Sequence, residues 1–138
     1  MNKSAAAAAL LFVVLLFAAC GKTQEGNTSS PGGSQGGAVN VTDAGFEQAI
    51  KTDQPVIVEF WSPSCSHCKN MAGTVDALAT EMSGKVKVLK VNVLENRDTT
   101  SKYGITGLPT FIMLKDGQVK AQALGEMTED ELKKSLGL

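Results

Sequence analysis

The chain has 138 residues, a length that favours one folded domain. Thirteen Lys and Arg residues against fourteen Asp and Glu residues leave a net charge of -1, which excludes the strongly basic composition typical of proteins that bind nucleic acid. Hydrophobic residues make up 43% of the chain and charged residues 20%, as in ordinary globular proteins rather than disordered or fibrous ones.

The amino-terminal part of the chain, residues 1–19, has the pattern of an export signal. Lys3 precedes an uncharged apolar run over residues 5–17, which has the length of a signal-peptide core and is too short to span a bilayer. Two alanines then stand directly before Cys20. The segment over residues 16–20 resembles the lipobox of bacterial lipoproteins, and this resemblance implies lipidation of Cys20 after cleavage. Ordinary signal cleavage near this point and an uncleaved anchor are the alternatives.

Residues 20–38 are predicted to form a tether. The stretch over residues 21–37 is rich in Gly and Ser and has no aliphatic or aromatic residue, so it cannot build a core. With lipid on Cys20, we expect the tether to hold a folded domain of residues 39–138 at the cell envelope, facing the periplasm or the exterior. Because Gly21 is not an aspartate that retains lipoproteins in the inner membrane, the outer membrane is slightly favoured if the cell has two membranes.

The folded part alternates between predicted strands and helices. In chain order we expect an edge strand over residues 38–41, a helix over 42–52 that Thr42 or Asp43 caps, and a strand over 56–61. A helix over 66–83, a strand over 86–93 and a helix over 96–103 follow. Two strands over 110–114 and 118–124 are joined by a turn at 116–117, and a last helix begins at a capping box of Thr128 and Glu131. The crossover helices and the terminal hairpin predict an α/β fold with a mixed central sheet and helices on both faces.

Cys65 and Cys68 form a C-x-x-C pair between a predicted buried strand and a predicted helix. Thiol–disulfide exchange needs an accessible thiolate and a second thiol close enough to resolve the mixed disulfide, and this spacing supplies both. Cys65 precedes the first helical turn, where free N–H groups and the helix dipole favour negative charge. Cys68 lies one turn inside the helix, so we expect it to be the shielded, resolving thiol.

Three segments of the chain resemble the thioredoxin superfamily. Residues 60–69, FWSPSCSHCK, resemble its active-site segment, and residues 103–111, YGITGLPTF, resemble its cis-proline loop. Residues 115–117, KDG, and the later Gly125 match its terminal hairpin and the turn that follows. The resemblance covers about residues 39–136 and implies the thioredoxin fold, a thiol–disulfide oxidoreductase activity, a redox-active disulfide between Cys65 and Cys68, and no cofactor.

The resemblance also implies a substrate groove beside the cysteine pair. Pro109 would follow a cis peptide bond and face the dithiol. The backbone of Leu108 would pair with an extended substrate peptide next to Cys65, which is a form of strand addition. Thr110 and Gly125 are predicted to border the same groove.

Glu59 is the one charged residue in an otherwise apolar predicted strand. Burial disfavours the charged form of a carboxyl group, so we expect the pKa of Glu59 to be raised. The residue occupies the position of a buried aspartate that, in thioredoxins, is thought to take a proton from the resolving cysteine, and Lys90 matches a lysine often found near that acid. A plain ion pair between Glu59 and Lys90, or a carboxylate that faces solvent, is the alternative.

His67 departs from common thioredoxins, which have proline at this position, and is similar to the histidine of strongly oxidising relatives. An imidazolium near the Cys65 thiolate stabilises the reduced form, and this makes the disulfide a better oxidant. A fully solvated histidine with little effect is the alternative. Ser66, within the motif, and Trp61, at the site wall, are the other predicted tuning residues.

These features support a reductase and an oxidase almost equally, and we slightly favour a reductase. A reductase outside the cytoplasm needs electrons from across the membrane, so we expect a membrane electron-transfer partner. The expected substrates are exported proteins with thiols or disulfides, and the protein is expected to be a monomer.

Two other functional classes fit part of the sequence pattern. A copper or zinc carrier would use Cys65, His67 and Cys68, but the chain has one histidine and a closed zinc site takes four ligands, so we predict no metal. A redox-inert module with the thioredoxin fold would use the groove only for binding, and the intact cysteine pair argues against it.

Overall fold

A computed structural model describes residues 36–138 of the chain. The predicted signal, Cys20 and most of the tether therefore lie outside the described residues. The elements are β1 (Val39–Asn40), α1 (Asp43–Ala49), β2 (Val56–Trp61), α2 (Ser66–Glu81), β3 (Lys87–Asn92), α3 (Arg97–Lys102), β4 (Thr110–Lys115), β5 (Gln118–Leu124) and α4 (Glu129–Leu136). Every element expected between residue 38 and the last helix is present. The bounds of β2 and β5 are as expected, and the others differ by at most three residues.

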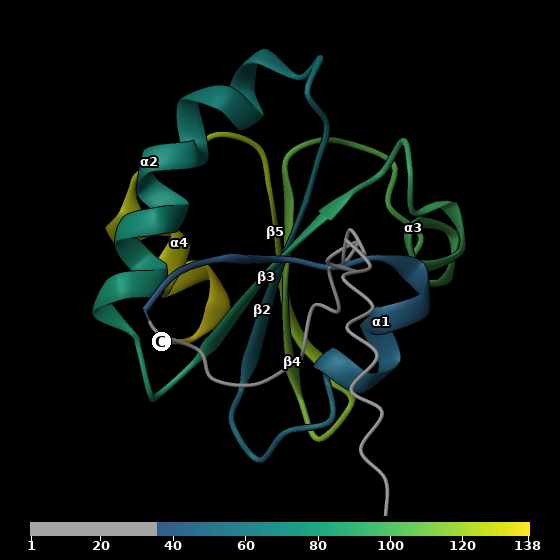
Figure 1. The fold of residues 1–138 in the computed structure, drawn as a ribbon. Helices are drawn as coiled ribbons and strands as arrows, with labels where there is room; N and C mark the ends of the chain where they lie inside the picture. Colours follow the sequence, from purple (N-terminus) through teal and green to yellow (C-terminus); the bar gives the residue numbers. More distant parts are fainter. Residues whose placement is uncertain (1–35) are drawn as a thin grey trace, which may run out of the picture. The chain divides into compact units, whose positions relative to one another are not determined.

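The strands form one mixed sheet in the order β1-β3-β2-β4-β5. β1, β3 and β2 run parallel, whereas β4 is antiparallel to both β2 and β5. Figure 1 shows α2 and α4 on one side of this sheet and α1 and α3 on the other. The predicted thioredoxin fold, with its mixed sheet and helices on both faces, is confirmed.

Two hydrophobic cores stabilise the fold, one on each face of the sheet. Alternate residues of β2 point to opposite faces, so Ile57 packs under α2 and α4 while Val58 and Phe60 pack under α1. Leu132 anchors α4 and Phe46 anchors α1, and each is almost fully buried. Burial of one such side chain stabilises the fold by roughly 1.5–3 kcal/mol. Glu59 has the same parity as Ile57 and therefore lies on the face that α2 covers.

The ends of the helices show where local signals decide the structure. The capping box of α4 is formed: the Thr128 side chain accepts from the Glu131 N–H, and the Glu131 carboxylate accepts from the Thr128 N–H. Gly84, with φ of +79°, follows α2 in a backbone conformation that other residues rarely adopt. In the described part of the chain, no helix combines the length and the apolar character needed to cross a membrane.

The start of α1 differs from the expectation that Thr42 or Asp43 would cap it. Thr42 occupies the cap position but makes no side-chain cap bond. The Asp43 carboxylate instead accepts from the Thr99 N–H at 2.9 Å, in the first turn of α3, and Asn96 Oδ1 accepts from the Asp43 N–H at 2.8 Å. The hydrogen bonds to Thr99 hold the pKa of Asp43 below its usual range. The two helices thus cap each other across a long sequence separation.

Candidate active site

The cysteine pair lies where the central strand β2 passes into α2. A short loop follows Trp61, and the Cys65 N–H donates to the Ser62 carbonyl at 3.2 Å, which closes a turn. Cys65 is the N-cap residue of α2, and its Sγ accepts from the Cys68 N–H at 3.1 Å. The two cysteines are joined by a disulfide bond, with their Cα atoms 5.3 Å apart. A sulfur held in this way at a helix start is in the setting that stabilises a thiolate.

The two sulfur-bearing residues differ in their access to solvent. Cys65 is half-buried, whereas Cys68 is only 3% exposed and packs inside the first turn of α2. A disulfide substrate can reach the first cysteine and not the second. The two cysteines therefore differ in the property that separates an attacking sulfur from a resolving one, which is access to a disulfide on another molecule.

The loop before β4 lies at the same end of the sheet as the disulfide. Thr110, the first residue of β4, pairs with Phe60, next to the end of β2. The Leu108–Pro109 peptide bond in this loop is cis, as the resemblance implied. The Gly125 N–H donates to the Pro109 carbonyl at 2.9 Å, and this bond ties the turn after β5 to the cis-proline loop.

The predicted groove residues do not all contribute their side chains to a groove. Thr110 is buried, and its hydroxyl donates to the Gly107 carbonyl at 2.7 Å, so its side chain shapes the loop from inside. Gly107 is packed so closely against Leu124 that a Cβ atom there would lie 3.0 Å from a Leu124 methyl carbon. Gly125 has φ of +98°, which disfavours any other residue. Leu108 is half-buried, and its place in a substrate groove stays a prediction.

Glu59 is buried in β2, as its apolar neighbours predicted, and is 1% exposed. Its neighbour across the parallel register is Lys90, whose Nζ lies 3.5 Å from Glu59 Oε2. That distance is long for a hydrogen bond, so the oxygen is paired electrostatically but has no hydrogen-bond partner among the described residues. Burial raises the pKa of Glu59, and the opposing charge of Lys90 offsets this only in part. Glu59 can therefore hold or release a proton beneath α2.

Trp61 and Lys90 form the wall beside this acid. Lys90 Nζ lies 5.4 Å from the centroid of the Trp61 ring, within cation–π distance. The Trp61 Nε1 atom is buried and lacks a hydrogen-bond partner within residues 36–138. Ser66 is exposed at the first helical position of α2. Trp61 thus lies next to the acid–lysine pair, while Ser66 lies at the surface of the motif.

Glu126 is a site residue that the sequence did not indicate. Its Oε2 lies 2.8 Å from His67 Nδ1 and 3.1 Å from Asn70 Nδ2, both on the first turn of α2. These two hydrogen bonds hold the pKa of Glu126 below its usual range. His67 and Glu126 are 59 positions apart. The sequence held one signal for a place of Glu126 in the site, which is that it directly follows Gly125, a residue already predicted to border the groove.

The residues that the metal-carrier alternative requires are not arranged as a ligand set. Within residues 36–138 no group of three or more His, Cys, Asp or Glu side chains is placed to hold a metal ion. His67 is engaged with the Glu126 carboxylate.

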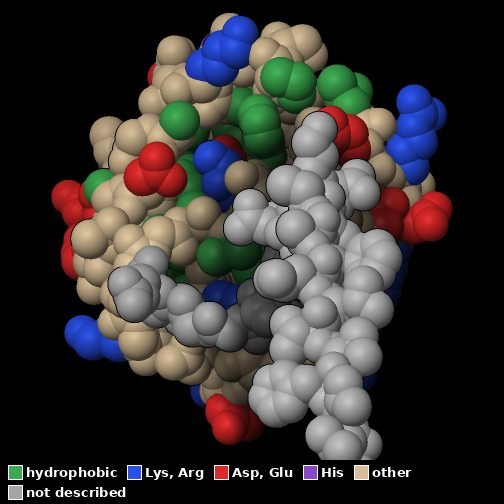
Figure 2. All heavy atoms as spheres, in the orientation of Figure 1, with side chains coloured by type: hydrophobic (Ala, Val, Ile, Leu, Met, Phe, Trp, Pro, Cys, Tyr) green, Lys and Arg blue, Asp and Glu red, His purple; other side chains and the backbone are tan. Residues whose placement is uncertain are grey.

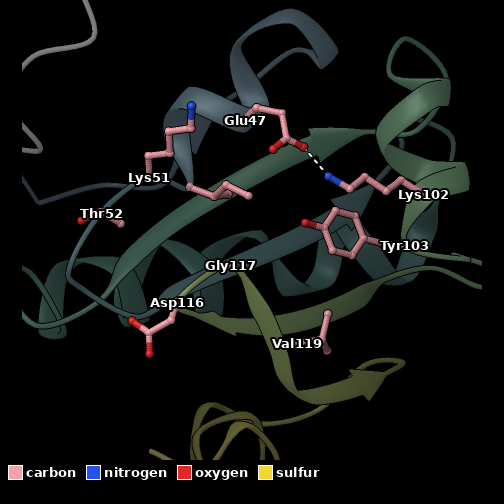
Figure 3. Close-up of a pocket in the computed structure, with 9 residues that line it drawn as sticks. Glu47, Lys51, Thr52, Lys102, Tyr103, Asp116, Gly117 and Val119 are labelled. Atoms are coloured by element: carbon pink, nitrogen blue, oxygen red, sulfur yellow. Dashed lines mark hydrogen bonds and ion pairs between the residues drawn. The ribbon is translucent and has the colours of Figure 1, made fainter.

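A depression of about 570 Å³ lies at the other end of the sheet from the disulfide. Figure 3 shows the side chains around it. Glu47 comes from α1 and Lys51 from the chain after α1, Lys102 and Tyr103 come from the end of α3 and the chain after it, and Asp116 and Gly117 come from the hairpin turn. Because β4 is antiparallel to β2, this turn lies opposite the end at which β2 leads into α2. None of the predicted site residues lines this depression.

The surface at the disulfide end is partly apolar. Figure 2 shows hydrophobic side chains gathered toward the end at which β2 leads into α2, with acidic and basic side chains scattered around the visible face. A protein substrate could therefore be held by apolar contacts and backbone pairing rather than by a field of one charge sign.

Comparison with known proteins places this geometry in one family. The profile described as Thioredoxin matches residues 37–137. The chain is 46% identical to a thioredoxin of Pseudomonas aeruginosa over 95 residues, which cover 68% of this chain and 88% of that protein. It is 41% identical to a thioredoxin of Alicyclobacillus acidocaldarius, over 71% of this chain and 93% of that protein, and 38% identical to one of Haemophilus influenzae, over 68% and 89%.

Proposed function

The chain belongs to the thioredoxin family and is a thiol–disulfide oxidoreductase, and we propose that it reduces disulfides of exported proteins while anchored at the cell envelope. The observation that carries the exchange chemistry is the difference in access between half-buried Cys65 and the 3% exposed Cys68. One accessible sulfur and one shielded sulfur, joined at a helix start, are what a two-step exchange requires.

In the first step the Cys65 thiolate attacks one sulfur of a substrate disulfide. A bond forms between Cys65 and that sulfur, the substrate S–S bond breaks, and the second substrate sulfur leaves as a thiolate that takes a proton from water. The substrate chain lies along Leu108 in the cis-proline loop and adds backbone hydrogen bonds there.

In the second step the Cys68 sulfur attacks Cys65, which releases the other substrate sulfur and forms the Cys65–Cys68 disulfide. Cys68 must lose its proton first, and Glu59, on the sheet face that α2 covers, accepts it directly or through a water molecule. The released substrate sulfur leaves as a thiolate and takes a proton from water, and Glu59 passes the Cys68 proton back to solvent. The substrate thus gains two electrons from the protein sulfurs and two protons from solvent. A dithiol partner that carries electrons across the membrane returns the protein to its reduced form.

The reductive direction rests on two observations. The relatives compared above align with most of the folded part and are named thioredoxins, and one of them is 46% identical. His67 is the residue whose positive charge would make the disulfide more oxidising, and its Nδ1 lies 2.8 Å from the Glu126 carboxylate. An imidazolium whose charge is balanced by a carboxylate stabilises a neighbouring thiolate less.

The reduction potential of the cysteine pair tests this direction. We expect a value of about -270 mV when the full chain is equilibrated with glutathione, because that is where thioredoxin-like reductants lie. All samples carry Cys20→Ser, so that Cys65 and Cys68 are the only cysteines. A value between about -120 and -180 mV would overturn the reductase and favour an oxidase or isomerase. The lack of any dithiol couple would overturn the exchange function itself.

The envelope location is proposed from the sequence around Cys20. A lipid on this cysteine, together with the Gly- and Ser-rich tether over residues 21–37, would keep the active site near the membrane and free to turn. Stable anchoring requires more than one acyl chain, since a single chain binds only marginally.

Replacement of Cys20 tests the anchor. In cells of the source organism, Cys20→Ser should move most of the protein from the membrane fraction to the soluble fraction and abolish the lipid mass on the mature chain, whereas Ser34→Ala in the same tether should change neither. Cell fractionation and intact mass spectrometry provide the readouts. If Cys20→Ser stays in the membrane fraction at unchanged mass, the lipid anchor is wrong and an uncleaved anchor replaces it.

A further inference from the structure

The Glu126 carboxylate connects two parts of the active site that are remote in sequence. It lies in the loop between β5 and α4, and it accepts from His67 and Asn70 on the first turn of α2 through the same oxygen atom, Oε2, at 2.8 and 3.1 Å. His67 stands between the two cysteines of the motif. The charge of Glu126 is therefore applied directly to the cysteine motif.

The backbone on both sides of Glu126 is fixed. The N–H of Gly125 donates to the Pro109 carbonyl at 2.9 Å, and the N–H of Met127 donates to the Met71 Sδ at 3.3 Å. One neighbour is thus tied to the cis-proline loop and the other to α2. Because the pKa of Glu126 is held below its usual range, the side chain is a carboxylate at neutral pH. Its charge is a constant feature of the site.

We propose that Glu126 is a positioning residue that holds His67 in an ion pair and so limits the oxidising strength of the Cys65–Cys68 disulfide. This inference rests on the proposed exchange function, in which Cys65 is the attacking thiolate. An imidazolium without a carboxylate partner stabilises the Cys65 thiolate and therefore the reduced protein. An imidazolium that is paired with a carboxylate stabilises the thiolate less. The carboxylate also repels the thiolate directly, and both effects favour the disulfide over the dithiol.

The exposure of the pair limits the size of the effect. The His67 side chain is 66% exposed and that of Glu126 is 42% exposed, so solvent and salt screen their charges. We therefore expect Glu126→Gln to raise the equilibrium constant for reduction of the disulfide by glutathione about threefold to tenfold, and a tenfold change corresponds to about 30 mV. The measured reaction converts the protein disulfide and two glutathione thiols into the protein dithiol and glutathione disulfide.

A double-mutant cycle tests the inference on the full chain with Cys20→Ser. The four proteins are the parent, Glu126→Gln, His67→Ala and the combination, and each is equilibrated with glutathione at low and at high salt. If Glu126 acts mainly through His67, the threefold to tenfold effect of Glu126→Gln falls below about twofold in the His67→Ala background and shrinks at high salt. Asp130→Asn, which removes one exposed acidic charge from α4, is the matched control and should leave the constant unchanged.

Three results would overturn the inference. They are an unchanged equilibrium constant in Glu126→Gln, a decrease instead of a rise, and an equal rise with and without His67. Asn70→Ala is a second test, because it keeps the charges of His67 and Glu126 and removes one hydrogen bond that orients Glu126. We expect it to raise the equilibrium constant less than Glu126→Gln does. If the parent protein shows no dithiol couple, the exchange function has failed; if the couple is present and insensitive to Glu126, this inference alone has failed.

Discussion

Cys68→Ser is expected to stop turnover at the mixed disulfide and to leave Cys65 covalently joined to its substrate. The accessible sulfur of Cys65 still attacks, but the serine hydroxyl at position 68 is too weak a nucleophile to release the product. Steady-state reduction of a protein disulfide should fall by roughly a thousandfold or more, as expected when a residue that forms or breaks the covalent bond is lost. Non-reducing electrophoresis and mass spectrometry of the trapped species measure both effects.

The reciprocal variant is the control for this trapping experiment. Cys65→Ser should be equally inactive but should trap no substrate, because Cys68 is only 3% exposed and cannot reach a disulfide on another protein. Trapping by Cys65→Ser with none by Cys68→Ser would reverse the two roles. Equal trapping by both variants would show that burial does not separate the two thiols. Either pattern would contradict the proposed order of the steps.

The fold could be predicted because its signals are local. The apolar run after Pro55 indicated a buried central strand, and Asp116 and Gly117 indicated the hairpin turn, where both residues have positive φ. Thr128 and Glu131 indicated the start of the last helix and form the expected capping box. Each signal spans a few residues, so no knowledge of the packing was needed.

The exchanged caps and the Glu126 contact could not be predicted because they join residues that no local pattern relates. Asp43 reads as a cap for its own helix, yet its carboxylate bonds to α3, 56 positions away at Thr99. Glu126 reads as an ordinary loop acid, and only the packing of the turn after β5 against α2 brings it to His67. Glu59 combines both situations. Its burial could be predicted from its apolar neighbours in the strand, whereas the 3.5 Å distance between its Oε2 and Lys90 Nζ could be found only in the structure.

Glu59→Gln is expected to make the protein more stable at neutral pH. Burial raises the pKa of Glu59 above its ordinary value of 4.5, so the folded state keeps a proton that the unfolded chain has lost. The free energy of unfolding therefore falls as pH rises from about 4.5 through the raised native pKa, and glutamine removes this loss. The variant should match the parent at low pH and exceed it by about 1–3 kcal/mol once Glu59 is ionised. Denaturant titrations across this pH range measure the difference.

The same substitution should slow the second chemical step, and this separates a proton relay from a plain ion pair. Glutamine accepts no proton from Cys68, so the mixed disulfide should accumulate and its resolution should slow by roughly a hundredfold, the lower range for general base catalysis. Glu59→Asp, which keeps the acid, should recover part of the rate. Lys90→Met also keeps the acid but removes the charge that lowers the pKa of Glu59, so the pH–rate profile should move to higher pH. If Glu59→Gln gains stability but resolves the mixed disulfide at the parent rate, the carboxyl group takes no part in the chemistry and the proton relay is wrong.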